Sequence, residues 1–242
     1  DWSSDVCSSD LIGILTNSST VSAGGVANGY AIKTNGTIWS WGANFYGQLG
    51  TNNTTYYSSP KQIGSLTNWS NLSGSLYCVA AIKTDGTLWS WGINNVGQLG
   101  IGNTYYYSSP KQVGSLTNWS SLGTSMPNAS GTVVMTAVKT DGTLWAWGDN
   151  SYGQVGQGTS GTKFSSPKQV GSLTNWTGQI AVGQITVSAV KTDGTLWTWG
   201  YGNYGSLGLG NISSYSSPKQ LGALTTWLLT GAGVYARYSS TS

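Results

Sequence analysis

A unit of about 50 residues recurs four times in this sequence, and such a period constrains the fold more than any local pattern. The clearest block of the unit reads Lys-Thr-Asp-Gly-Thr-Leu-Trp-Ser-Trp-Gly at residues 83–92, and it returns with small changes at 33–42, 139–148 and 191–200. A second block, Ser-Ser-Pro-Lys-Gln, places prolines at 60, 110, 167 and 218, each followed nine residues later by a tryptophan. Spacing this regular predicts one structural element per unit, packed against its neighbours.

Each unit carries a turn signal inside the first block. The turn pairs are Asn35-Gly36, Asp85-Gly86, Asp141-Gly142 and Asp193-Gly194. Such pairs favour two-residue type I′ turns between antiparallel strands. Counting outward from the third turn predicts that Val138 lies opposite Trp145, and alternation along the strand places Trp145 and Trp147 on one face. The other face carries Leu144 and Ala146.

A sheet with tryptophans on one face and leucine on the other has no solvent-facing side, so it must pack between similar sheets. The Gly-Gln-Leu-Gly segment, at 97–100 and its relatives, is expected to supply tight bends and a short strand. The Pro-Lys-Gln block is expected to begin an edge strand, where a missing N–H is tolerated. We therefore predict an all-β fold, a β-propeller of four-stranded antiparallel blades, with about four blades plus a partial one and no helix longer than about two turns.

The composition removes most catalytic designs. Only 7% of the residues are charged, histidine is absent and all seven acids are aspartates, which excludes Ser-His-Asp triads, His-ligated zinc and paired-glutamate chemistry. Residues 200–205 match the G-x-G-x-x-G pattern, but no helix pattern follows them, so no cofactor is expected. The turn aspartates are explained by turn chemistry, and the recurring lysines are expected to be solvated at strand ends. The chain is predicted not to be an enzyme.

The charge and the cysteines also limit the partners. The formal net charge is only +3 and no run of Lys or Arg occurs, so the basic patch expected of a nucleic-acid-binding protein is not predicted. No apolar stretch reaches the length of a membrane span. No signal peptide is visible. Cys7 and Cys78 are too few for a disulfide framework and leave the redox compartment undetermined.

At the level of whole motifs the chain resembles a known family. The pattern Trp-Ser-Trp-Gly-x-Asn-x-x-Gly-Gln-Leu-Gly, at residues 39–50 and 89–100, is similar to the signature of the regulator of chromosome condensation repeat. The resemblance covers about residues 20–238 and implies a β-propeller of four-stranded blades, with a bacterial or phage-like origin expected. It does not imply one function, because the family includes a nucleotide exchange factor for a small GTPase, a UV-B photoreceptor and an inhibitor of β-lactamases.

The ends of the chain differ from the middle. Residues 1–11 fit no repeat register and resemble a translated sequencing adapter, whereas 12–238 are expected to form a single propeller domain and 239–242 a tail. Residues 231–238 resemble the start of a fifth unit that stops before its hairpin, so the ring is expected to be incomplete. Uncovered blade faces are then expected to favour self-association.

The leading functional hypothesis is a non-catalytic scaffold that binds a protein or glycan through loops, at an extracellular or surface-associated location. The alternative is a regulatory protein, either exchange-factor-like or a tryptophan-based photoreceptor. Recognition is expected where the units differ, because shared positions are explained by the scaffold. The predicted partner-binding residues are surplus to the repeat: Tyr56, Tyr105, Tyr106, Met126 and Pro127.

Overall fold

The computed structural model describes residues 17–23, 28–124, 133–183, 185–229 and 238–240, and this part of the chain is built from antiparallel strands. The first blade holds β1 (Ser18–Ala23), β2 (Asn28–Lys33), β3 (Ile38–Gly42) and β4 (Tyr57–Gln62). The second holds β5 (Trp69–Gly74), β6 (Cys78–Lys83), β7 (Leu88–Gly92) and β8 (Tyr107–Gln112). The third holds β9 (Trp119–Thr124), β10 (Val134–Lys139), β11 (Leu144–Gly148) and β12 (Phe164–Gln169). The fourth holds β13 (Trp176–Val182), β14 (Thr186–Lys191), β15 (Leu196–Gly200) and β16 (Tyr215–Gln220).

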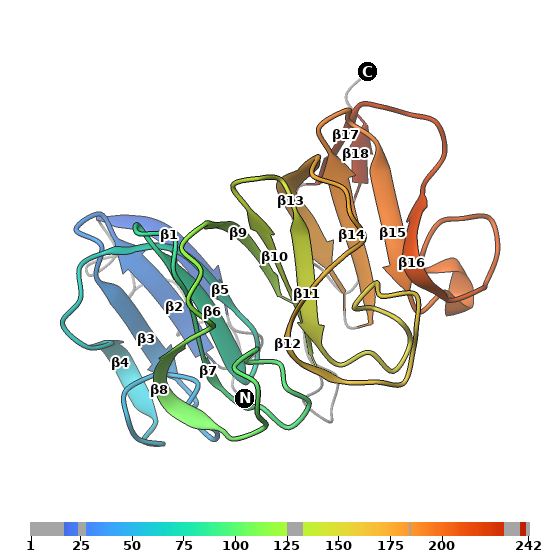
Figure 1. Ribbon diagram of the computed structural model, residues 1–242. Coiled ribbons are helices and arrows are strands. Elements are labelled where there is room, and N and C mark those ends of the chain that lie inside the picture. Colours follow the sequence, from blue (N-terminus) through green and yellow to red (C-terminus); the bar gives the residue numbers. More distant parts are fainter. Residues whose placement is uncertain (1–16, 24–27, 125–132, 184, 230–237, 241–242) are drawn as a thin grey trace, which may run out of the picture.

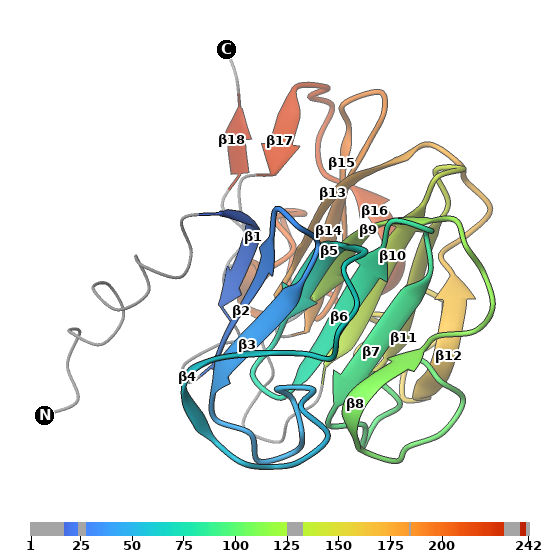
Figure 2. The same ribbon diagram turned by 90° about the vertical axis from the view of Figure 1, so that its left-hand side faces the viewer.

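The four blades stand side by side in chain order (Figures 1 and 2), and in each the strands pair in sequence order. The first strands β1, β5, β9 and β13 pack against one another, so they form the inner side, while β4, β8, β12 and β16 are the outer edges. A two-stranded sheet of β17 (Trp227–Leu229) and β18 (Tyr238–Ser240) follows the fourth blade. The predicted propeller blades, four with a partial fifth, are confirmed. In the described residues the one helix is the 3-10 turn η1, Asn203–Gly205.

The core lies between the blades. Three apolar clusters fill the three gaps between neighbouring blades, and each contains a fully buried tryptophan from the third strand of the later blade. Trp91, Trp147 and Trp199 donate their indole N–H across the gap to the carbonyls of Gln48, Gln98 and Gln154, at 2.8, 2.9 and 2.9 Å. This bond explains why the Gly-Gln-Leu-Gly segment and its relatives recur at the same place in each unit, because a backbone carbonyl of the segment accepts the indole hydrogen bond from the next blade. The short strand expected there is absent, because the segment is a chain of turns.

The hairpin turn differs from the prediction by one residue. Lys139 N–H donates to the Thr143 carbonyl at 3.0 Å and Gly142 N–H to the Lys139 carbonyl at 2.9 Å, so the loop holds three residues and not two. Gly142 has φ +76°, whereas Asp141 does not have a positive φ, and the turn is type I followed by a glycine bulge. The register therefore places Ala137, not Val138, opposite Trp145. The predicted face sharing is unaffected, because Trp119 contacts both Trp145 and Trp147.

The turn aspartate explains the choice of turn. Asp141 accepts hydrogen bonds from the Thr143 hydroxyl at 2.6 Å and backbone N–H at 2.9 Å, and Thr143 in turn accepts one from the Trp145 indole at 2.8 Å. Asp85 and Asp193 make the same bonds, while Asn35 replaces them in the first blade. The bonds to threonine hold the pKa of the three carboxyl groups below its usual value.

Replacing the turn aspartates by asparagine should make the free energy of unfolding fall less steeply as the pH is lowered from 5 to 2. Because their folded-state pKa values are depressed, their stabilisation is complete above the unfolded value near pH 4 and is lost as pH falls through the folded values. The measurement is the denaturant midpoint of wild type and of the Asp85→Asn, Asp141→Asn, Asp193→Asn variant from pH 5 to pH 2. Parallel curves would show that these bonds do not distinguish the folded from the unfolded state.

The lysine that precedes each turn is not solvated, contrary to the prediction. Lys83, Lys139 and Lys191 are only 7, 6 and 5% exposed. Each ammonium lies over two indole rings, for example 3.7 Å from the Trp145 centroid and 4.9 Å from that of Trp119. Burial lowers the pKa of these lysines. The invariant lysine is therefore part of the blade's packing through cation–π contacts. The second set, Lys61, Lys111, Lys168 and Lys219, is exposed as predicted.

Candidate partner-binding surface

Five described loops join the strands at one end of the blades, and we call this end the loop face. Its loops span residues 43–56, 75–77, 93–106, 149–163 and 201–214. They lie at the lower edge of the view in Figure 1, opposite the Asp-Gly hairpins at the upper edge. Antiparallel pairing within each blade brings every second connection to the same end. Segments that are about 50 residues apart in the sequence are thereby gathered on one surface.

A buried asparagine holds the long loop of each of the first three blades in shape. Asn94 is fully buried, its amide N–H groups donate to the carbonyls of Asn103 at 2.9 Å and Tyr105 at 3.1 Å, and its Oδ1 accepts from Leu99 N–H at 2.9 Å. Asn44 does the same in the first blade. Because the backbone next to the exposed tyrosines is fixed by these bonds, their rings are presented by an ordered loop, which lowers the entropic cost of binding.

The structure exposes the three predicted tyrosines on this face. The exposed fractions of Tyr56, Tyr105 and Tyr106 are 54, 72 and 48%. All three side chains are therefore accessible on this face. The other two predicted residues, Met126 and Pro127, lie outside the described residues.

Two of these tyrosines belong to a cluster that the sequence did not indicate. Tyr56 packs edge-on against Phe45 at 4.9 Å, and Tyr106 against Tyr46 at 5.6 Å between ring centroids. Tyr46 also contacts Tyr77 at 5.0 Å and Phe45 at 6.5 Å. We call Phe45, Tyr46, Tyr56, Tyr77 and Tyr106 the aromatic cluster. It spans the first two blades, so only the folded arrangement brings its members together. The signal available in the sequence was that Phe45 and Tyr46 replace Asn95 and Val96 of the next unit.

The loop face is almost free of charge. Its described loops contain two ionisable acid or base side chains, Asp149 and Lys163. Asp149 is 3% exposed and accepts hydrogen bonds from the side chains of Ser151 and Gln154, both at 2.7 Å. Its carboxylate is therefore bonded within the loop and is not presented on the surface. The remaining surface is aromatic, amide and hydroxyl. Such a surface suits a partner region of low charge.

The titratable groups beneath this face are buried structural groups. Burial raises the pKa of Tyr30, whose hydroxyl donates to the Gln48 carbonyl at 3.2 Å. Burial also raises the pKa of Cys78 to about 11, which disfavours the reactive thiolate. Cys7 lies outside the described residues. Within the described chain no group of three or more His, Cys, Asp or Glu side chains is placed to hold a metal ion. Nor does any described helix have the length and hydropathy of a membrane span.

Residues 200–205, which match the dinucleotide pattern, lie at the end of β15 and the start of the long loop of the fourth blade, residues 201–214. Gly202 stands where Asn44 and Asn94 stand in earlier blades, so this loop lacks the asparagine anchor. The Gly202 N–H donates to Ser214 Oγ at 3.1 Å. The segment contains the three-residue 3-10 turn η1, Asn203–Gly205, and the described residues that follow it form turns and not an α-helix. The geometry of a helix N-terminus that would hold a pyrophosphate is therefore missing from this segment.

Comparison with known proteins agrees with the fold. The family model described as "Regulator of chromosome condensation (RCC1) repeat" matches residues 35–82, 85–122, 141–190 and 193–233. The E3 ubiquitin-protein ligase HERC2 of Homo sapiens is 36% identical over 99 residues, which is 39% of this chain and 2% of HERC2. The probable E3 ubiquitin-protein ligase HERC3 of Homo sapiens is 35% identical over 91 residues, which is 37% of this chain and 9% of HERC3.

Two solved structures share the architecture. Prp20p from Saccharomyces cerevisiae superposes with a TM-score of 0.71 at 19% identity, covering 86% of this chain and 51% of Prp20p. Human WBSCR16 superposes with a TM-score of 0.68 at 24% identity, covering 83% of this chain and 50% of that protein. The chain thus spans about half the length of these structures and a small part of the HERC relatives.

Proposed function

The chain belongs to the regulator of chromosome condensation (RCC1) repeat family, and from that premise we propose that it is a non-catalytic scaffold that binds a protein partner through its loop face. The observation that carries the proposal is the aromatic cluster. Exposed, ordered tyrosines are the side chains that contribute most often to binding hot spots. Soluble proteins seldom expose apolar groups in contiguous patches without such a role.

A protein is favoured over the other partner classes by what the relatives bind. The structure of Prp20p is described together with its binding to Gsp1p and histones, and those partners belong to Prp20p. For this chain we propose the coarser class alone. The low charge of the loop face makes histones and other strongly basic proteins poor candidates here, since they are recognised through acidic surfaces. A glycan is the other occupant that would fit hydroxyl and aromatic groups, and the experiment below distinguishes it.

The test replaces Tyr56, Tyr105 and Tyr106 by serine. We expect the variant to fold, because the exposed fraction of each of the three tyrosines is 48% or more. We also expect it to bind a captured protein partner at least 10-fold more weakly, which corresponds to about 1.4 kcal/mol. Partners are identified by comparing affinity captures on the wild-type chain and the variant by quantitative mass spectrometry. Dissociation constants are then measured with the purified partner.

The matched control is Tyr204→Ser, which removes a tyrosine that is 97% exposed in the fourth blade, outside the aromatic cluster. This variant should retain binding. Proteins captured equally by wild type and the triple variant would contradict the proposal, and so would a glycan array that binds the wild-type chain when no protein does. Loss of folding in the triple variant would show that the three rings stabilise the loops.

The regulatory alternative has its own readouts. An exchange-factor-like protein would accelerate nucleotide release from a small GTPase, and a tryptophan-based photoreceptor would change its absorbance or assembly under UV-B light. The tryptophans of the blades already have packing partners: Trp69, for example, contacts Trp89 at 6.1 Å and Trp91 at 6.2 Å, next to Lys83. This packing role supports the scaffold over the photoreceptor as the first function to test.

A further inference from the structure

Four leucines occupy the same position in every unit and are nevertheless exposed. Leu66, Leu116, Leu173 and Leu224 have exposed fractions of 47, 46, 45 and 55%. Another apolar position shared by all units, occupied by Ile38, Leu88, Leu144 and Leu196, is fully buried and explained by packing. A half-exposed leucine gains little from the fold, so its recurrence is not explained by the scaffold. The assumption that recognition must lie where the units differ therefore does not hold for this position.

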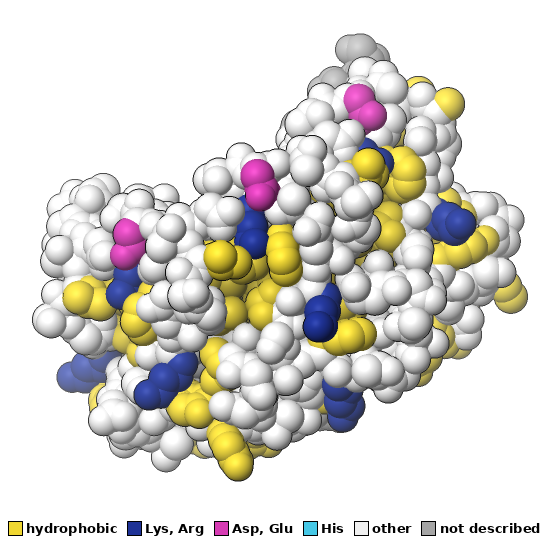
Figure 3. Space-filling view, viewed as in Figure 1, with side chains coloured by type: hydrophobic (Ala, Val, Ile, Leu, Met, Phe, Trp, Pro, Cys, Tyr) yellow, Lys and Arg dark blue, Asp and Glu magenta, His cyan; other side chains and the backbone are white. Residues whose placement is uncertain are grey.

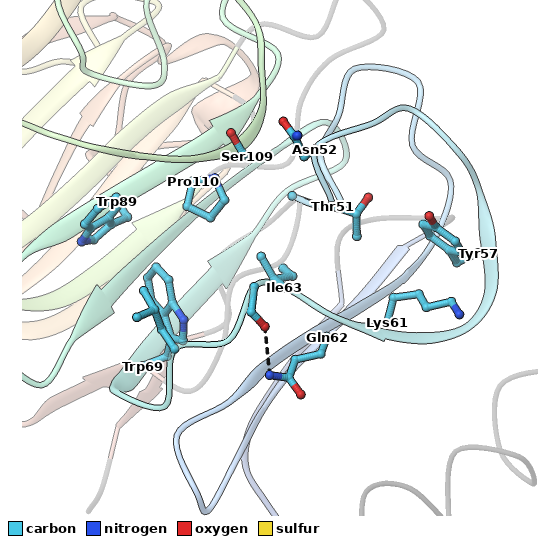
Figure 4. Close-up of a pocket in the computed structure, with 13 residues that line it drawn as sticks. Thr51, Asn52, Tyr57, Lys61, Gln62, Ile63, Trp69, Trp89, Ser109 and Pro110 are labelled. Carbon is cyan, nitrogen blue, oxygen red and sulfur yellow. Dashed lines mark hydrogen bonds between the residues drawn. The ribbon is translucent and has the colours of Figure 1, made fainter.

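Two of these leucines, Leu66 and Leu116, line grooves between neighbouring blades on the outer side. The groove between the first two blades has a volume of about 530 Å³, and that between the second and third about 310 Å³. The apolar side chains of the first groove (Figure 4) are Ile63, Leu66, Trp69, Trp89 and Pro110. Val113, Leu116, Trp119, Trp145 and Pro167 stand in the same places in the second. The same groove thus recurs at two successive blade gaps, and both volumes fall within the range of ligand pockets.

The lining favours an amino-acid side chain over a sugar ring. Sugars stack on open aromatic faces, but Trp69 is 3% exposed and the Lys83 ammonium lies 3.8 Å from the centroid of the Trp89 ring. The accessible walls are instead the half-exposed side chain of Leu66 and the partly exposed ring of Pro110. Burial of a leucine-sized side chain against such walls is favourable in proportion to the apolar area removed from water.

The charge at the groove rim is positive. Lys61 lines the first groove together with Thr51, Asn52, Gln62 and Ser109, and no carboxylate is among the described lining residues. Its equivalent Lys111 is exposed and directly precedes Gln112, which lines the second groove. On the face shown in Figure 3, hydrophobic side chains lie in hollows between the blades with lysines beside them, while the acidic side chains lie at the upper edge. A neighbouring acidic residue on the ligand would therefore be attracted to the rim.

We propose that the grooves between blades bind an extended acidic peptide segment of a partner, with one apolar side chain buried in a groove against Leu66 or Leu116 and an acidic side chain beside Lys61 or Lys111. The outer edge of β4 is a poor template for an added strand, because Pro60 lacks an N–H and Lys61 follows it. The peptide is held by its side chains across the groove. Two adjacent grooves allow a peptide with two such motifs to bind with avidity. This site is separate from the loop face.

The probe is the peptide Gly-Ser-Asp-Leu-Glu-Leu-Asp-Ser-Gly, added to the full chain carrying isotope-labelled leucine methyl groups. We expect saturable NMR shifts of the Leu66 and Leu116 methyl signals. Two control peptides, one with serine for both leucines and one with lysine for the three acids, should bind at least 10-fold more weakly. A tandem peptide with two motifs joined by a Gly/Ser linker should bind more tightly than the single one.

Substitutions separate the groove from the rest of the surface. Leu66→Ser with Leu116→Ser should weaken binding at least 10-fold, and Lys61→Ala with Lys111→Ala should remove the preference for the acidic over the basic peptide. Ile212→Ser, which removes an aliphatic side chain that is 70% exposed elsewhere, should change nothing. The variant with serine at 56, 105 and 106 should bind the peptide normally, so failure here and failure of the loop-face proposal are distinguishable.

Three results would overturn the proposal. The first is equal binding of the acidic, basic and serine peptides. The second is unchanged binding in the double leucine variant, which would place the peptide elsewhere. The third is a shift of the groove signals by an oligosaccharide such as cellohexaose when the peptide gives none, which would make the groove a sugar site.

Discussion

Replacing Trp147 by alanine should lower the free energy of unfolding by about 3–5 kcal/mol, the largest loss expected from one side chain in this fold. Trp147 is fully buried in the cluster between the second and third blades, and its ring centroid lies 6.2 Å from that of Trp119. Its indole N–H donates to the Gln98 carbonyl at 2.9 Å. The substitution leaves a cavity and removes this hydrogen bond in the same gap. The measurement is the denaturant midpoint and slope from circular dichroism.

A second variant separates the two contributions. Trp147→Phe keeps most of the apolar volume but removes the N–H, so we expect a smaller loss, of about 0.5–1.5 kcal/mol, from the missing hydrogen bond to the Gln98 carbonyl. Phe45→Ala, at a side chain that is 58% exposed, should cost far less than Trp147→Ala. A change below 1 kcal/mol for Trp147→Ala would mean that the blades do not depend on this contact.

Replacing Gly97 by alanine should destabilise the contact between the second and third blades and lower the free energy of unfolding. Gly97 has φ +79°, and a Cβ added to it would lie 2.5 Å from the Ser165 Cα in the outer strand of the next blade. The left-handed backbone and the backbone clash together should cost roughly 2–4 kcal/mol. The readout is again the denaturant midpoint, supplemented by amide exchange in β12.

Gly114→Ala is the matched control for this variant. Gly114 has φ +63°, and its added Cβ would meet nothing within 4 Å, so that variant should show only the backbone strain of about 1 kcal/mol. Equal losses at Gly97 and Gly114 would contradict the account, because they would show that the close approach of the blades contributes nothing.

The architecture could be predicted because its signals are local and repeated. The Asp-Gly turns, the alternation of Trp145 with Leu144 and the edge proline each report on a few neighbouring residues, and the period then fixes how the sheets pack. The type I′ prediction was wrong because Asp141 accepts bonds from Thr143 and so favours a type I turn with Gly142 as the bulge. Two-residue and three-residue loops share the same Asp-Gly pair, and only the hydrogen bonds distinguish them.

The misread features depend on contacts between strands. Lys139 looked like an ordinary solvated cation, and its place over Trp145 and Trp119 follows from pairing β10 with both β11 and β9. In the same way, the sequence picked out Tyr56 and Tyr106 as surplus aromatics but gave no means of joining them to Phe45 and Tyr46. The exposed Leu66 could not be recognised either, because identity between units suggested packing.

Hydrogen exchange of the chain with and without its captured partner tests the loop-face proposal most directly. We predict that binding slows exchange in residues 43–56 and 93–106, which carry most of the aromatic cluster, and leaves the hairpin turns around residues 35 and 85 unchanged. The hairpins lie at the opposite end of the same blades, so they are an internal control. Protection confined to the hairpin end, or absent from both loops while the partner remains bound, would contradict the proposal.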